Sequence, residues 1–224
     1  MAKSKIIKEF ANNEISLEVA LNRLIIIASD IENDELAQWA ENELNGYHEA
    51  SKLPVYRIIE NTRFLYSGIN GNLNVTNAPL QLTEIIGADK LDDKFYIFDG
   101  VESLISFVNS QNKYEYAKDL TAYAGIVRAK TGVLCTLIKQ VIPINEIVNI
   151  ISTIKSKLLK VLIALDKEYG CLDKLDIDIT HKDPKKVRKI NSIIINYIYE
   201  DRSIKIGDKN RIDSTDIQSG EKHG

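Results

Sequence analysis

The sequence predicts an α+β fold with an N-terminal helical hairpin, a small antiparallel β region, a long buried helix and a C-terminal isoleucine-rich β tail. Three observations lead to this prediction. Residues 145–170 repeat apolar side chains at helical spacing, and residues 16–46 hold two shorter segments of the same kind. Residues 55–75 are instead rich in β-prone residues, with Asn70-Gly71 between two apolar runs.

The segment 145–170 is expected to be one helix that the rest of the fold covers. One side carries apolar residues at alternating steps of four and three: Ile147, Ile151, Ile154, Leu158, Val161 and Leu165. The opposite side gathers polar residues, Lys157 and Lys160 among them. Asn145 is expected to cap the first turn, and Gly170 to end the helix. Each central lysine would cost roughly 2.5–3.5 kcal/mol in a bilayer, so a core helix is favoured over a membrane span. A helix lying on a membrane surface stays open.

The N-terminal part is predicted to be a short helix followed by a helical hairpin. Ile6, Ile7 and Phe10 indicate the short helix. Ser16 is expected to cap the second helix, and the third runs from about Asp34 to Leu44. The break between these two is short, so they should be antiparallel neighbours.

The β region is predicted from short apolar or β-branched runs between turn residues. Asp99 and Glu102 could form a catalytic carboxylate pair, but their three-residue spacing before an apolar run favours helix capping. The strands expected here are Arg63–Ile69, Asn72–Val75, Lys94–Phe98, Val133–Ile142 and Leu172–Thr180, with a turn at Asn77–Pro79 and a loop or weak helix at Lys113–Lys130.

The C-terminal part is expected to be separate from the α+β domain of residues 1–180. We predict a charged linker at 181–191, a β-prone tail at 192–218 and a disordered end at 219–224. The tail carries too many apolar side chains to stay free in water: Ile193, Ile195, Ile198, Ile204, Ile206, Ile212 and Ile217. Pairing with tails of other chains is the favoured interpretation, and an edge strand on the same chain is the alternative.

Composition and motifs favour a binding module over an enzyme. The net charge of -3 is not that of a protein that binds nucleic acid over its whole surface. A local basic run could still follow a phosphate backbone, although a solvated linker is the simpler interpretation: Lys182, Lys185, Lys186, Arg188 and Lys189. The three histidines are not at metal-ligand spacing, and there is no phosphate loop or nucleophile elbow. We therefore predict no catalytic residue, metal or cofactor.

The cysteines and the N-terminus indicate the compartment, and we expect the cytoplasm. Cys135 and Cys171 are interpreted as reduced structural thiols. The N-terminus is charged and lacks the apolar core of a signal peptide.

Three segments resemble the opening of the AbiTii domain family. They are I-S-L-E-V-A-L-N-R-L at 15–24, D-E-L-A-Q-W-A-E-N-E-L-N-G-Y at 34–47 and L-P-V-Y-R at 53–57. Residues 77–80 and the long helix resemble later parts of the pattern, so the resemblance covers roughly residues 3–180. The motif positions are Trp39, Glu43, Gly46, Tyr47, Pro54, Tyr56 and Arg57.

The resemblance implies a role in bacterial defence against phage of the abortive-infection type, and it supplies no catalytic residues. The motif positions could pack the hairpin against the first strand, which is expected in the extended segment Val55–Ile59. Alternatively, Tyr47, Tyr56 and Arg57 could form an exposed recognition surface where the hairpin meets the sheet.

The expected function is a defence module that works by protein association, through its own tail or with a partner protein of a defence operon. We expect neither nucleic acid nor membrane as its partner. An effector that uses the basic run on nucleic acid and an effector that releases the long helix onto a membrane remain alternatives.

Overall fold

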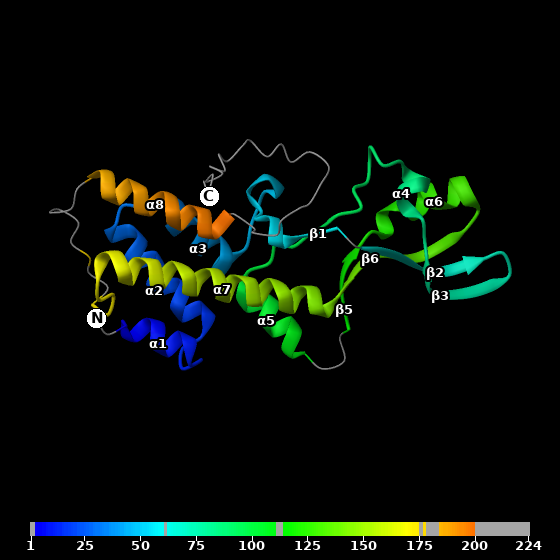
Figure 1. The fold of residues 1–224 in the computed structure, drawn as a ribbon. Helices are drawn as coiled ribbons and strands as arrows, with labels where there is room; N and C mark the ends of the chain where they lie inside the picture. Colours follow the sequence, from blue (N-terminus) through cyan, green and yellow to red (C-terminus); the bar gives the residue numbers. More distant parts are fainter. Residues whose placement is uncertain (1–2, 61, 111–113, 175–176, 178–183, 200–224) are drawn as a thin grey trace, which may run out of the picture.

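The computed structural model describes residues 3–60, 62–110, 114–174, 177 and 184–199. They form an elongated molecule with a helical lobe at one end and a β lobe at the other (Figure 1). The lobes are joined where strand β6 (Leu134–Pro143) runs directly into helix α7 (Ile144–Tyr169). The described parts combine helices with small antiparallel sheets, which confirms the predicted α+β class.

Helix α7 is the centre of the helical lobe, as its apolar repeat predicted. Ile147, Ile154, Leu158, Val161 and Leu165 are all fully buried. Gly170 ends the helix with φ +84°, a conformation that glycine adopts without strain. The predicted cap at Asn145 is wrong because the helix already begins at Ile144, after Pro143 as the N-cap residue. Pro143 supplies no side-chain hydrogen bond, and its restricted φ suits the entry into the helix.

The helical hairpin lies against α7, and the first of its two helices is capped as predicted. Its helices are α2 (Leu17–Asp30) and α3 (Asp34–Asn45), preceded by α1 (Lys5–Ala11). Ser16 Oγ accepts a hydrogen bond from the Val19 amide at 3.2 Å, which confirms that cap. Asn33 caps α3 in the same way through the Leu36 amide at 3.0 Å.

The C-terminal segment is helical where a strand was predicted. Helix α8 (Pro184–Tyr199) packs on α3 and α7, so the β prediction for Ile193, Ile195 and Ile198 is wrong. Ile194 and Ile198 are fully buried and lie four residues apart, so burial at helical spacing outweighs the β preference of isoleucine.

The predicted linker 181–191 is also wrong from Pro184 onward, because those residues form the first turns of α8. Proline suits the first helical position, where its missing amide would have no partner in any case. The isoleucines at 204, 206, 212 and 217, Lys182 and the predicted disordered end lie outside the described residues.

The β lobe is a four-stranded antiparallel sheet in the order β3-β2-β6-β5, with α4 and α6 on one face (Figure 1). Next to it, α5 belongs to the helical lobe, and β1 and β4 form a two-stranded sheet. The bounds are β1 Ile58–Ile59, β2 Arg63–Asn70, β3 Leu73–Pro79, α4 Leu82–Ile86, β4 Phe95–Tyr96, α5 Val101–Asn109, β5 Glu115–Asp119, α6 Ala124–Thr131, and the 3-10 turns η1 Ala50–Lys52, η2 Val55–Arg57 and η3 Thr121–Tyr123.

The hairpin β2–β3 and the strand β6 confirm the sequence predictions. The burial predicted for β6 holds mainly for its second half, because Leu134 and Leu137 are exposed. The turn predicted at Asn77–Pro79 instead belongs to β3, where Asn77 takes φ +52° at a bulge that keeps β3 paired with β2. The segment predicted as a loop or weak helix at Lys113–Lys130 contains strand β5 as well as helix α6. In the described part of Leu172–Thr180, which is Leu172–Lys174 and Ile177, no residue lies in a strand.

The predicted capping of α5 by Asp99 is wrong. Gly100 is the N-cap residue, and no side chain caps the helix. The Asp99 carboxylate instead accepts a hydrogen bond from the Tyr116 hydroxyl, which ties this helix start to strand β5. The carbonyl of Asp99 has a separate role in the site described below.

Hydrogen bonds and an ion pair hold the N-terminal residues Lys3 and Ser4 against the end of α7. Asp166 accepts hydrogen bonds from the Ser4 amide at 3.0 Å and from the Ser4 hydroxyl, and Lys3 forms an ion pair with it at 3.1 Å. Ser4 Oγ in turn accepts from the Leu172 amide at 2.9 Å. Burial alone would raise the pKa of Asp166, but the Ser4 hydrogen bonds and the Lys3 charge outweigh it and lower the pKa.

Replacing Asp166 with asparagine is expected to destabilise the protein in a pH-dependent way. A carboxyl with a lowered folded-state pKa contributes stability above its unfolded pKa of about 3.9, and this contribution is lost as the pH falls through the folded-state value. The variant should therefore lose about 1–2 kcal/mol at pH 7 and approach the wild type at low pH. Urea unfolding at pH 7 and pH 3 measures this, and an equal gap at both pH values would contradict it.

Candidate functional site

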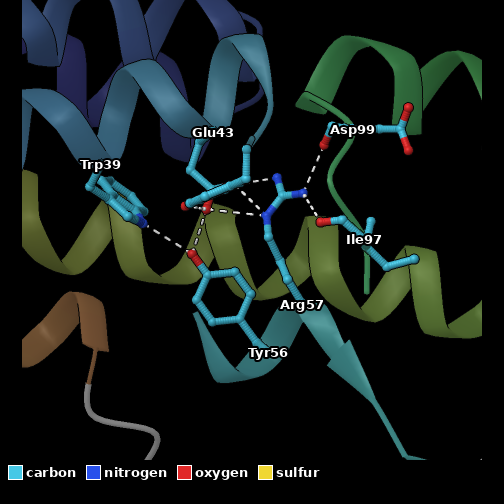
Figure 2. Close-up of polar contacts among 7 residues, drawn as sticks. Trp39, Glu43, Tyr56, Arg57, Ile97 and Asp99 are labelled. Atoms are coloured by element: carbon cyan, nitrogen blue, oxygen red, sulfur yellow. Dashed lines mark hydrogen bonds and ion pairs between the residues drawn. The ribbon is translucent and has the colours of Figure 1, made fainter. Parts of the chain in front are cut away.

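The family-motif residues meet in a buried polar cluster around the carboxylate of Glu43 (Figure 2). We call Trp39, Glu43, Tyr47, Tyr56 and Arg57 the Glu43 cluster. Glu43 accepts hydrogen bonds from the Tyr47 hydroxyl at 2.7 Å and the Tyr56 hydroxyl at 2.6 Å. Arg57 forms an ion pair with it, with Nη2 at 2.5 Å from Oε2 and Nε at 3.2 Å from the same oxygen. Trp39 Nε1 donates to the Tyr56 hydroxyl at 3.0 Å.

The end of α3 sets the position of this cluster. Trp39 and Glu43 lie four residues apart and therefore on the same side of the helix. Gly46 then turns the chain with φ +94°, and a Cβ there would lie 2.6 Å from the Phe98 carbonyl oxygen. Gly100 is equally confined, because its Cβ would lie 2.1 Å from the Leu44 carbonyl oxygen. Two glycines thus let the end of α3 pack directly on the backbone at residues 98–100.

Arg57 joins this backbone to the cluster. Its Nη1 donates to the carbonyls of Ile97 at 3.2 Å and Asp99 at 2.7 Å, while Nε and Nη2 donate to Glu43. The guanidinium carbon also lies 5.0 Å from the centre of the Tyr47 ring. Arg57 is fully buried, and its ion pair and hydrogen bonds offset the free-energy cost of burying the charged guanidinium.

Helices α7 and α8 close the cluster from the other side. Lys157 Nζ lies 5.2 Å from the centre of the Tyr56 ring and donates to the Tyr197 carbonyl at 3.2 Å. The sequence pattern predicted that Lys157 lies on the solvent side of α7. This is wrong, because α8 covers Lys157 and leaves it 6% exposed. A carbonyl near the C-terminal end of a helix is a favourable partner for a cation.

The electrostatics of the cluster favour the neutral form of both phenols and the charged form of Arg57. Burial, and then the negative charge of Glu43, raise the pKa of Tyr47 and of Tyr56 far above the ordinary tyrosine value. Burial alone would lower the pKa of Arg57, but Glu43 raises it above the ordinary arginine value. Both phenols therefore stay neutral hydrogen-bond donors at physiological pH.

The structure brings Tyr47, Tyr56 and Arg57 together, but the alternative of an exposed surface is wrong for Tyr47 and Arg57, and Tyr56 is half-buried. Arg57 is 0% and Tyr47 5% exposed, because Glu43 and the carbonyls at 97 and 99 draw their polar groups inward. The packing interpretation of the motif agrees with this arrangement. The sequence did not predict that Lys157 contacts Tyr56, or that the carbonyls of Ile97 and Asp99 bind Arg57. Backbone carbonyls cannot be recognised from a pattern of side chains.

The remaining candidates lie apart from the cluster. Arg188 and Lys189 are exposed on α8, whereas the side chains of Lys182, Lys185 and Lys186 lie outside the described residues. Cys135 is buried and Cys171 exposed, and both are free; burial raises the pKa of the Cys135 thiol. Within the part of the chain that the structure describes, no group of three or more metal-ligating side chains comes together, and no helix is long and apolar enough to span a membrane.

In a comparison with known protein families, the match covers most of the chain and not only the motif positions. The family model AbiTii matches residues 4–191, a range that includes the helical hairpin, the β lobe, α7 and the first turns of α8. No curated protein and no solved structure matches the chain. Since the match covers well over half of the sequence, the chain belongs to the AbiTii family, which is associated with abortive infection.

Proposed function

We propose that this protein acts in abortive-infection defence against phage by associating with protein, in the cytoplasm, and that it associates with copies of itself. Membership of the AbiTii family supports the role in defence. The observation that carries the association is a group of exposed apolar side chains at the end of the β lobe that points away from the helical lobe.

This group consists of Ile69, Leu73, Leu134 and Leu137, which we call the distal β surface. Their side chains are 41%, 71%, 39% and 37% exposed. Leu73 lies opposite Asn70, at the tip of the β2–β3 hairpin. The register places the other three side chains together on one face of the sheet, because Ile69 is opposite Leu134 and Leu137 is opposite Ser67. Helices α4 and α6 pack on the opposite face of the sheet, around Phe64, Tyr66 and Ile138. Clustered exposed apolar side chains are typical of surfaces that bind protein.

Self-association through the C-terminal isoleucines is the second part of the proposal. Ile194 and Ile198 are buried within the chain, so contacts between chains would use the residues after Tyr199. The suitable truncation therefore ends at Tyr199, because a cut after Lys189 would remove most of α8 and uncover the core. If the tail contributes, this truncation should lower the mass in light scattering, and an unchanged mass would exclude the contribution.

The distal β surface is tested by replacing Leu73 and Leu137 with aspartate. Both side chains are exposed, so the fold should tolerate the change, while the charges oppose burial in an interface. We expect the mass in light scattering to fall to that of the monomer, and the protection of bacteria in a phage plating assay to fall with it. Ile163→Asp is a matched control, because Ile163 is 39% exposed but lies on α7. A monomeric wild type, or an equal effect of the control, would contradict the proposal.

A further inference from the structure

The distal end of the β lobe has an unusual distribution of charge. No charged residue occurs from Phe64 to Thr83, which includes most of β2 and all of β3. From Leu120 to Ile138 the only charged residues are Arg128 and Lys130, and both are exposed near the end of α6. Gly132 and Val133 lead from the end of α6 directly to Leu134, so these two cations lie close to the distal β surface in the chain, on the helix that packs against the other face of the sheet. This end of the molecule is therefore apolar and cationic, without a carboxylate in either segment.

The α2–α3 hairpin has the opposite character. Its only cation from Leu17 to Asn45 is Arg23, which already forms an ion pair with Glu9 at 2.9 Å. Five of its carboxylates form no ion pair with any described residue: Glu18, Glu32, Asp34, Glu35 and Glu41. Four of these are exposed, and Glu18 is half-buried.

The hairpin also exposes apolar side chains on α2. Val19 and Ile26 are 41% and 47% exposed, and their seven-residue spacing places them on the same side of α2. We call this set of acids, together with Val19 and Ile26, the acidic hairpin surface. Like the distal β surface it combines apolar contact area with charge, but the charge is of the opposite sign.

We infer that the distal β surface of one copy docks on the acidic hairpin surface of a second copy. Opposite charges around two apolar areas favour this pairing and disfavour contact between two identical ends. The surfaces lie at opposite ends of the elongated molecule, with α2 and α3 in the helical lobe and the β2–β3 hairpin at the far end of the β lobe (Figure 1). The contact is therefore head-to-tail, and repetition builds an open chain unless the rotation closes a ring. This rests on the proposed function, because it names the partner of the surface proposed there.

Charge reversal on each side is the direct test, with sedimentation velocity as the readout. Arg128→Glu alone and Glu41→Lys alone should each weaken association at least about tenfold, which corresponds to about 1.4 kcal/mol. An equimolar mixture of the two variants should recover it, because each variant then offers the charge that the other needs. Lys118→Glu, an exposed charge on β5 in the same lobe, is the control and should have little effect.

A second experiment tests the head-to-tail geometry. A chain with Leu73→Asp and Leu137→Asp lacks the distal β surface, and a chain with Val19→Asp and Ile26→Asp lacks the acidic hairpin surface. Each alone should be monomeric, and their mixture should form a dimer and nothing larger, since each chain keeps one working surface. Circular dichroism of each variant checks that it is folded.

The outcomes separate this inference from the proposed function. If the distal substitutions lower the mass but Glu41→Lys and the Val19 and Ile26 substitutions do not, association stands and the acidic partner surface is wrong. If the distal substitutions leave the mass unchanged, the association that the proposed function assigns to the distal β surface is itself wrong. Binding of vesicles rich in anionic lipid that is lost with Leu73→Asp, without any change in mass, would assign the distal β surface to lipid and overturn the inference.

Discussion

Replacing Glu43 with glutamine is expected to lower the free energy of unfolding by about 3–5 kcal/mol, the range observed when one partner of a buried ion pair is removed. The Arg57 guanidinium would remain fully buried and lose the carboxylate with which it forms its ion pair. The hydroxyls of Tyr47 and Tyr56 would also lose a charged acceptor. Urea unfolding followed by circular dichroism measures the loss.

Glu41→Gln is the matched control, because Glu41 lies two residues earlier on the same helix and is exposed. Its substitution should change stability by less than about 0.5 kcal/mol. A double-mutant cycle adds Arg57→Met: the combined loss should be smaller than the sum of the two single losses, since no buried charge is then left without its partner. Additive losses, or equal effects of the Glu43 and Glu41 substitutions, would show that the ion pair is not the centre of the cluster.

The Glu43 cluster illustrates how far the sequence can predict a site. The motif letters at Glu43, Tyr47 and Arg57 predicted that these residues belong together, and they left two interpretations open, inward packing and an exposed surface. Glutamate and arginine are mostly exposed in proteins, so a surface was a reasonable expectation. Their burial depends on the carbonyls of Ile97 and Asp99, more than forty positions along the chain from Glu43, and on a close approach of the Gly100 backbone. No side-chain pattern encodes these contacts.

In the fold as well, elements defined by a local sequence pattern were predictable, and elements defined by tertiary contacts were not. Helices α2, α3 and α7 were predictable because their buried positions repeat with the helical period, and two of them begin at a recognisable cap. Helix α8 was not, because its isoleucines favour strands locally and only their burial on α3 and α7 selects the helix. Strand β5 was missed for a related reason: E-Y-A-K-D lies at a sheet edge, where charged side chains are common and apolar alternation is weak.

Replacing Gly68 with alanine is expected to disrupt the β lobe while leaving the helical lobe folded. A Cβ at this position would lie 2.0 Å from the Leu134 carbonyl oxygen and 3.0 Å from the Cys135 Cα, and both are backbone atoms of the neighbouring strand. Strands β3 and β6 each have a register shift beside Gly68, so β2 passes unusually close to β6 here. The strands would have to separate, at a cost of about 3 kcal/mol or more.

The effect should also reach the distal β surface, because Gly68 lies next to Ile69 and pairs beside Leu134. We therefore expect faster hydrogen exchange in peptides from β2 and β6, unchanged exchange in α7, and weaker self-association. Gly125→Ala is the control, since a Cβ at Gly125 in helix α6 meets no heavy atom within 4 Å. That change should be neutral or stabilise by up to about 1 kcal/mol, because alanine favours the helix. Faster exchange spread equally over both lobes would mean that the β lobe does not unfold separately, and unchanged exchange in β2 and β6 would mean that the strands absorb the extra atom.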